Sequence, residues 1–392
     1  MIAFEKALEL IMTDVKATGT ERVDMHAALF RVLAEDIFSD TDMPPFDKSA
    51  MDGYACRRAD LGYELEVLEV IAAGETATRQ VGRGQCVKIM TGAMIPEGAD
   101  TVIMVEHTLE TEAGKIRFTG SQTPANIALK GEDVKAGDMV WQKGTHILPQ
   151  HMAMLASVGW TEPIVARRPT VAVLSTGDEL VEPDRFPGTG KIRNSNGAQL
   201  VAQVKAAHCI PVYMGIIPDD YETTRLMIRK ALAEHDVVVL SGGVSMGDFD
   251  FVPRIMREEG VEIIFQKVAI KPGRPTVFGR TSKACIFGLP GNPVSSFINF
   301  EVMVKPLLYK MMGCHYQTRD YQAKLGTAFS RKKNDRPEWL PAMYDGAGHV
   351  VPVAYHGSAH IHAITLAHGL IFIPLGVREM AKGDAVSFRP LS

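Results

Sequence analysis

The middle of the chain alternates short apolar runs with longer amphipathic stretches. The apolar runs are too short for helices and rich in β-branched residues, which predicts buried strands at 170–175, 237–240 and 283–287. Helical patterns lie between or after these strands, at 198–207, 222–235, 251–259 and 293–312. Strands that alternate with helices predict a parallel α/β sheet with right-handed connections.

The flanking regions follow other patterns. Apolar residues recur at helical spacing from Phe4 to Val15, and a second helix is expected at 25–35. Short strand-like runs separated by turn residues fill 64–119 and 323–388. We therefore predict an α/β multidomain protein with four parts: a helical connector and dimerisation domain (1–40 and 138–168), an inserted β-rich domain (41–137), a central parallel α/β domain (169–318) and a small C-terminal β-barrel (319–392).

Composition narrows the range of functions. The 392 residues carry a net charge of −4, so nothing global indicates nucleic-acid binding. The five cysteines lie far apart without a C-x-x-C pair, which favours free thiols in a reducing compartment. The sequence shows neither a signal peptide nor a run of membrane-spanning length, so we expect a cytoplasmic protein without membrane contact.

Glycine-rich or acidic loops follow the predicted strands of the α/β domain. In the loop after 237–240, which includes Ser241, Gly242, Gly243 and Ser245, a ligand could approach the backbone N–H groups closely, because two of these residues are glycines. Carboxylates that could hold a cation follow two of the strands: Asp178, Glu179 and Asp250. Because ligands bind at the carboxyl ends of parallel strands, we expect one shared pocket. The combination predicts a phosphorylated ligand with a metal ion.

Two further segments suit an anionic ligand. The third strand leads into Pro290, Gly291, Asn292 and Pro293, where Asn292 is a good N-cap and Pro293 suits the first helical position. The free N–H groups of a helix start attract phosphate. Lys267, Lys271 and Arg274 form a local basic patch in an otherwise acidic chain.

Two other motifs are weaker candidates. Gly188-Thr189-Gly190-Lys191 lacks the earlier glycine, the following Ser/Thr and the preceding strand of a P-loop, so we reject that interpretation. The histidines between His356 and His368 include His360 and His362, which could bind zinc from one strand face, although no Cys or carboxylate completes the set.

Several motifs occur in a fixed order along nearly the whole chain: F-D-K-S-A-M-D-G-Y-A, I-M-T-G-A-M-I-P-E-G-A-D, G-E-D-V, S-T-G-D-E-L, S-G-G-V-S-M-G-D-F-D, A-I-K-P-G-R-P and G-L-P-G-N-P-V-S. The chain resembles the molybdopterin molybdenumtransferase family, which includes MoeA and the gephyrin E domain. Lys48 stands where the family pattern has Asn, and the C-terminal domain matches more loosely.

The resemblance implies an elongated homodimer that inserts molybdate into adenylylated molybdopterin, releases AMP, forms molybdenum cofactor and requires Mg²⁺. It also implies site roles that agree with the residue chemistry. The expected catalytic residues are Asp52, Thr91, Asp133, Glu179, Asp219, Lys267 and Lys271. The expected substrate-binding residues are Ser241, Gly242, Gly243, Ser245, Arg274, Pro290, Gly291, Asn292 and Pro293. The expected metal ligands are Asp178, Glu179 and Asp250.

Two alternatives stay open at this point. A molybdopterin adenylyltransferase would resemble only the α/β unit, and a non-enzymatic scaffold would not need the acids and lysines. Expected partners are the adenylyltransferase and the enzymes that accept the cofactor. Because Asp52 and Thr91 belong to the inserted domain, behind the stiff Met43-Pro44-Pro45 segment, we expect them to cover the pocket of the partner subunit. The apolar stripe of the first helix would then form part of the dimer surface.

Overall fold

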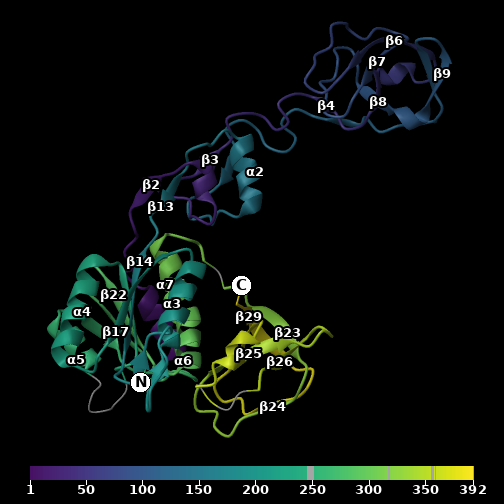
Figure 1. Cartoon of the computed structure of the whole chain (residues 1–392). Coiled ribbons are helices and arrows are strands. Elements are labelled where there is room, and N and C mark those ends of the chain that lie inside the picture. The colour runs from purple at the N-terminus through teal and green to yellow at the C-terminus, as the bar shows by residue number, and fades with distance from the viewer. Residues whose placement is uncertain (245–250, 317, 355–356, 358, 392) are drawn as a thin grey trace.

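The computed structural model describes residues 1–392 except 245–250, 317, 355–356, 358 and 392. The chain is elongated (Figure 1). The α/β domain and the C-terminal barrel lie at one end, the inserted β domain lies at the other, and the connector lies between them. In the described part of the chain, no helix has the length and apolar character needed to cross a membrane.

A six-stranded sheet forms the centre of the α/β domain. Its order is β17 (Ile210–Ile217), β14 (Thr170–Thr176), β18 (Val237–Ser241), β22 (Cys285–Leu289), β21 (Val277–Arg280) and β19 (Glu262–Phe265). The first four strands are parallel; three of them, β14, β18 and β22, were predicted, and β17 was not. β21 pairs antiparallel with both β22 and β19, and neither β21 nor β19 was predicted; the two strands flank the segment 266–275, which we interpreted as an extended basic segment.

Helices cover both faces of this sheet because alternate strand residues point to opposite sides. Val237 and Val239 pack in one core, while Val238 and Leu240 pack in the other. The first core includes residues of α3 (Ser195–Ala206), α6 (Pro293–Asn299), the π-helical stretch η4 (Phe300–Val304) and α7 (Lys305–Met311). The second includes residues of α4 (Tyr221–Glu234) and α5 (Val252–Glu258).

The N-terminal helix belongs to this α/β core. In α1 (Phe4–Met12), Phe4, Ala7 and Ile11 are buried against the first core, and β1 (Ile2–Ala3) pairs with β20 (Val268–Ala269). The apolar stripe is therefore used within the chain, so its assignment to a dimer surface was wrong. Helix α1 likewise does not pack in the connector, to which we assigned residues 1–40.

The connector is less helical than expected. It contains β2 (Thr20–Arg22), β3 (Ile37–Phe38), β12 (Met139–Trp141), α2 (Pro149–Ser157) and β13 (Ile164–Ala166). The helix expected at 25–35 is only the 3₁₀ turn η1 (Met25–Ala28). It cannot continue because Phe30 has a φ of 60°, outside the helical range.

The inserted domain is a six-stranded sheet, which confirms its β-rich character. Its order is β8 (Thr101–Met104), β5 (Gly53–Cys56), β7 (Gln85–Ile89), β6 (Glu64–Ile71), β10 (Lys115–Phe118) and β9 (Thr108–Glu112). Two 3₁₀ turns, η2 (Arg58–Asp60) and η3 (Val105–His107), connect strands. At its base β4 (Lys48–Ser49) pairs with β11 (Ile127–Ala128).

The C-terminal region is a closed five-stranded barrel, as predicted. Its order is β23 (Tyr321–Leu325), β26 (His349–Pro352), β25 (Glu338–Tyr344), β27 (Gly369–Ile373) and β29 (Ala385–Pro390). The small elements β24 (Phe329–Ser330), β28 (Glu379–Met380) and α8 (His362–Thr365) accompany it. Backbone hydrogen bonds join Lys271 to Pro337 (2.9 Å) and Trp339 to Lys271 (2.8 Å), so the barrel docks directly on the α/β domain.

Candidate active site

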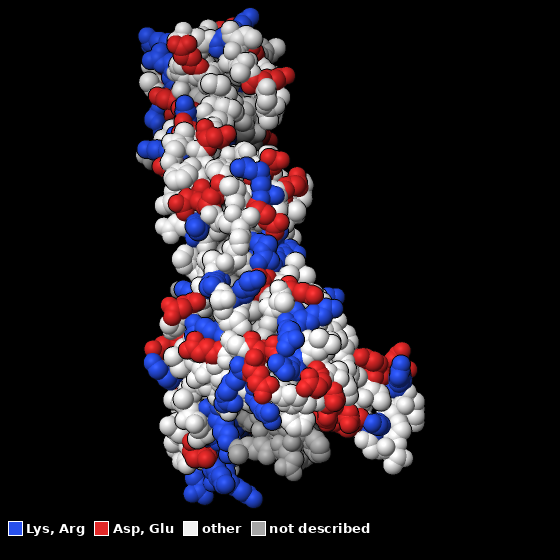
Figure 2. Space-filling model, turned by 90° about the vertical axis from the view of Figure 1, so that its left-hand side faces the viewer, with Lys and Arg blue, Asp and Glu red and all other residues white. Residues whose placement is uncertain are grey.

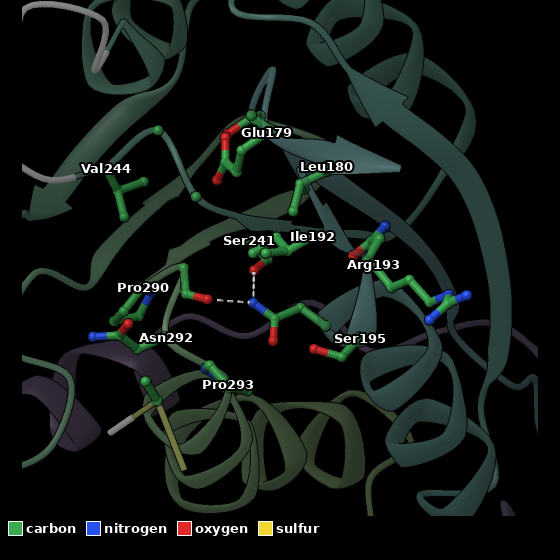
Figure 3. Close-up of a pocket in the computed structure, with 18 of the residues that line it drawn as sticks. Glu179, Leu180, Ile192, Arg193, Ser195, Ser241, Val244, Pro290, Asn292 and Pro293 are labelled. Carbon is green, nitrogen blue, oxygen red and sulfur yellow. Dashed lines mark hydrogen bonds between the residues drawn. The ribbon is translucent and has the colours of Figure 1, made fainter. Parts of the chain in front are cut away.

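A cavity of about 660 Å³ opens at the carboxyl ends of β14, β18 and β22. Glu179 and Leu180 lie on the side opposite Pro293, and Ser241 lies between them (Figure 3). The cavity brings together nine of the predicted site residues: Glu179, Asp219, Ser241, Gly242, Gly243, Pro290, Gly291, Asn292 and Pro293. Four segments that are far apart in the sequence thus form one pocket.

The paired glycines are required by close packing against the end of β14. Gly242 and Gly243 have φ angles of 98° and 65°, which residues with a side chain rarely adopt. A Cβ on Gly242 would lie 2.7 Å from the carbonyl oxygen of Thr176, and one on Gly243 would lie 2.9 Å from Cγ2 of Val252. The loop therefore leaves its backbone exposed to a ligand at a fixed position.

Asn196, a residue that the sequence analysis missed, joins two of the loops. Its side-chain Nδ2 donates to Oγ of Ser241 (2.6 Å) and to the carbonyl oxygen of Gly291 (2.7 Å). Asn194 caps α3 by accepting from the N–H of Gly197 at 3.0 Å. The Asn-Ser-Asn sequence before a helix could have indicated this cap. The other lining residues that were not predicted are Thr176, Gly177, Leu180, Ile192, Arg193, Ser195, Val244, Pro275, Ala359 and Ile361.

A second polar network borders the same wall. Asn194 donates to the hydroxyl of Tyr213 (2.9 Å), which donates to Oε1 of Glu182 (3.0 Å). Burial, together with the neighbouring carboxylate, raises the pKa of Tyr213 to about 12. The phenol therefore stays protonated and serves to hold Asn194, not to transfer protons near neutral pH.

The acidic side of the cavity pairs two loops. The N–H of Asp219 donates to Oδ1 of Asp178 (3.1 Å), and the N–H of Asp178 donates to Oδ2 of Asp219 (3.3 Å). Glu179 and Asp219 line the cavity, and Asp178 is linked to it through Asp219. Two predicted site residues, Ser245 and Asp250, lie outside the described residues. Among the residues that are described, no three His, Cys, Asp or Glu side chains are grouped as a metal site.

A second cavity of about 870 Å³ lies between the α/β domain and the barrel. It shares Pro275, Pro290 and Asn292 with the first cavity, so the two adjoin. Its lining includes the cations Lys271, Arg331, Lys332, Lys333 and Arg336. Only Lys271 was predicted. The run Arg331-Lys332-Lys333 could have been noticed as a charge cluster, but its contact with the α/β domain is not visible in sequence.

The other two predicted cations lie elsewhere. Lys267 and Arg274 are absent from the described lining of both cavities. Their backbone carbonyls instead support the fold: that of Lys267 accepts from the N–H of Ile2 (3.0 Å), and that of Arg274 accepts from the N–H of Val268 (3.0 Å). Of the three predicted cations, Lys271 is the one found in the described lining of these two cavities.

The predicted residues of the inserted domain are remote from both cavities within one chain (Figure 1). Asp52 and Thr91 form a pair of their own, in which the N–H and hydroxyl of Thr91 each donate to Oδ1 of Asp52 at 2.7 Å. These hydrogen bonds lower the pKa of Asp52. Asp133 is exposed, and its N–H donates to the carbonyl of Met43 (3.0 Å).

The histidine-rich segment is only partly described. His356 is among the undescribed residues, and His362 begins the short helix α8, not a strand. The Nδ1 atom of His368 accepts from the N–H of Tyr344 (3.0 Å). The strand-face arrangement on which a zinc role for His360 and His362 depended is therefore not formed.

Charged residues of both signs are interspersed over the long side of the molecule (Figure 2). Lys and Arg side chains gather at the lower end of that view (Figure 2). This distribution agrees with the net charge of −4 and leaves the cations of the second cavity as a local feature.

Comparison with known proteins covers nearly the whole chain. Residues 2–159 match the MoeA N-terminal region (domain I and II), 172–310 a probable molybdopterin binding domain, and 322–391 the MoeA C-terminal region (domain IV). The molybdopterin molybdenumtransferase of Staphylococcus epidermidis is 37% identical over 397 residues, 98% of this chain and 94% of the relative. That of Bacillus subtilis is 34% identical over 399 residues, 98% and 93% of the two chains.

Solved structures agree. The crystal structure of the molybdopterin biosynthesis moeA protein from Pyrococcus horikoshii OT3 superposes with a TM-score of 0.87 at 33% identity, covering 100% of both chains. Sequence and architecture thus lead to one conclusion: this chain belongs to the molybdopterin molybdenumtransferase (MoeA) family.

Proposed function

We propose that this protein is a transferase of molybdenum cofactor biosynthesis that inserts molybdate into adenylylated molybdopterin and releases AMP. The observation that carries the proposal is the pair of adjoining cavities. One has exposed glycine backbone at strand ends, which suits the phosphates of the pterin substrate. The other is lined by five cations, which suits a tetrahedral oxyanion.

The residues of the two cavities would have different chemical roles. The N–H of Gly243 and the N–H groups at the start of α6 would bind phosphate oxygens, whereas the N–H of Gly242 already donates to the carbonyl of Leu289 (3.1 Å). Lys271, which lines the adjoining second cavity, would face the charge between phosphate and molybdate. Asn196 would keep the phosphate-binding loops at their spacing through its bonds to Ser241 and Gly291.

We further propose that the reaction requires Mg²⁺. The expected ligands are the carboxylates of Asp178, Glu179 and Asp250, since this ion prefers oxygen ligands; Asp250 lies outside the described residues, and the described acids alone do not group as a three-ligand site. The backbone N–H of each of Asp178 and Asp219 donates to the carboxylate of the other, which brings these two acids side by side. When bound, Mg²⁺ would neutralise the phosphates of the substrate. The acids themselves would hold the ion at the cavity edge.

We also propose that the protein acts in the cytoplasm as a homodimer whose site spans two subunits. Asp52 and Thr91 are bonded to each other and lie in the domain farthest from their own cavity (Figure 1). A two-fold dimer would let each inserted domain cover the partner's cavity. The adenylyltransferase would supply the substrate, and molybdenum-dependent enzymes would take the product.

The test of the reaction is to incubate the protein with adenylylated molybdopterin and Mg²⁺ and to measure AMP before and after adding molybdate. A transferase releases AMP only when molybdate is present. An adenylyltransferase would instead consume ATP with unmodified molybdopterin. Binding without AMP release would favour a scaffold and contradict the proposal.

The shared site is tested by mixing two variants of low residual activity, Asp52→Ala and Lys271→Ala, under conditions that exchange subunits. In a mixed dimer one of the two sites is intact, so random mixing should restore about a quarter of wild-type activity. The control mixes Asp52→Ala with Thr91→Ala, which both damage the inserted domain and should stay inactive. If the first mixture stays inactive although native mass spectrometry shows heterodimers, each site is built within one chain.

A further inference from the structure

Glu338, a buried carboxylate at the start of β25, stands between two cations of the second cavity. Its side chain is only 3% exposed. Oε1 lies 2.6 Å from Nζ of Lys271, and Oε2 lies 3.3 Å from Nη1 of Arg331. The contact with Lys271 joins the barrel to the α/β domain.

The two cations differ in what they can still bind. Arg331 is buried, and its guanidinium also donates to the carbonyls of Val377 (2.7 Å), Arg336 (2.9 Å) and Pro374 (2.6 Å). Its hydrogen bonds are therefore largely used by the barrel itself. The side chain of Lys271 is 46% exposed, and its ammonium has three N–H groups, so donors remain for a ligand.

The backbone fixes the spacing of this pair. Lys271 and Glu338 form an isolated parallel bridge, supported by the hydrogen bonds between Lys271 and both Pro337 and Trp339. A lysine side chain has many rotamers, and ordering it on binding costs affinity. An ion pair anchored on both backbones removes that cost in advance.

We propose that Glu338 is a positioning residue that holds the ammonium of Lys271 in place to receive the oxyanion. This inference rests on the proposed function and extends it to a barrel residue that does not itself touch the substrate. Of the described residues that line the second cavity, Glu338 is the only acid, among five cations. Its single carboxylate therefore orients one cation and leaves the lining of the cavity with a net positive charge.

The test is a double-mutant cycle with wild type, Glu338→Gln, Lys271→Ala and the double variant. Molybdate-dependent AMP release gives separate KM values for molybdate and for adenylylated molybdopterin. Glu338→Gln should raise the KM for molybdate about tenfold, the cost of reordering one long side chain. The KM for the pterin substrate should change less than about twofold. Glu338→Asp, which keeps the charge, should recover part of the loss.

The decisive comparison is made without Lys271. If Glu338 acts through that lysine, Glu338→Gln should add less than about twofold to the KM of Lys271→Ala. An undiminished effect there, or no effect of Glu338→Gln in a folded protein, would overturn the proposal. Asp320→Asn is the matched control, since it breaks another barrel ion pair, Asp320–Arg389 at 2.7 Å, and should leave the molybdate KM unchanged.

Failure of the proposed function would look different. In that case wild type would release no AMP on addition of molybdate, and the cycle could not be read as a change in KM. Equilibrium dialysis with molybdate alone then provides the second measurement. Binding to wild type that is unaltered in Glu338→Gln would contradict the positioning role independently of catalysis.

Discussion

Gly242→Ala should reduce activity more than a matched glycine substitution elsewhere in the same domain. The added methyl carbon would lie 2.7 Å from both the carbonyl oxygen and Oγ1 of Thr176. Ordinary contact begins near 3.5 Å, so the shortfall is about 0.8 Å. Thr176 ends β14, which is hydrogen-bonded between β17 and β18, and its carbonyl cannot retreat. The loop at residue 242 must therefore move by on the order of 1 Å.

Two costs follow from this movement. The φ of 98° is unfavourable for any residue with a Cβ, by about 1–2 kcal/mol, and overpacking adds about 1–3 kcal/mol. We expect the free energy of unfolding to fall by about 2–5 kcal/mol. Displacing a substrate-positioning backbone by about 1 Å typically costs on the order of 10²-fold in rate. AMP release should fall by that factor.

Gly260→Ala is the matched control. Gly260 has a φ of 77° and follows α5 in the same domain, and a Cβ added there would meet no heavy atom within 4 Å beyond its chain neighbours. The free energy of unfolding of Gly260→Ala should fall only by the cost of the positive φ, about 1–2 kcal/mol, and its activity should be unchanged. Urea unfolding measures stability, and molybdate-dependent AMP release measures activity. Equal activities of the two variants would refute the claim that the loop at Gly242 holds the substrate.

Three further outcomes are expected. Lys271→Ala should reduce AMP release far more than Lys283→Ala, because Lys283 borders a groove at the other end of the sheet; equal losses would show that Lys271 only contacts solvent. Burial and the nearby His146, Arg168 and Lys305 lower the pKa of His208 to about 4, so the unfolded state binds its proton first as pH falls below about 6.5. The free energy of unfolding, measured with urea, should then drop by roughly 1–2 kcal/mol between pH 6.5 and 4. An equally large drop over this pH range in His208→Gln would contradict the prediction. Leu200→Ala, in the fully buried face of α3, should cost about 2–5 kcal/mol, and a loss below about 1 kcal/mol would show that the core repacks around it.

Local patterns were sufficient to predict most of the α/β domain. The runs that became β14 and β18 are β-branched and buried on both faces, so periodicity and length identify them. The loops after these strands could be placed in one pocket because parallel strands share an orientation. Nothing more than the order of strands and helices was needed for that step.

Features that depend on contacts between distant segments were missed. The basic wall of the second cavity needs the barrel to dock beside Lys271, a contact set by the pairing of Lys271 with Glu338. The bonds of Asn196 to Ser241 and Gly291 likewise need three loops in place. The amphipathic pattern of α1 correctly predicted a helix, but a stripe of apolar residues does not say which core it covers.

The packing of α1 also sets the order in which the newly made chain can fold. Ile2 pairs with Val268, so the first element finds its partner only after most of the chain has left the ribosome. At roughly 5–20 residues per second this takes about 15–50 s. The connector and the inserted domain can complete their own sheets earlier, since their strands lie within the first part of the chain. During this interval the apolar side chains of α1 are accessible to chaperones and proteases: Phe4, Ala7 and Ile11. Protease cleavage within α1 in ribosome-arrested chains would test this.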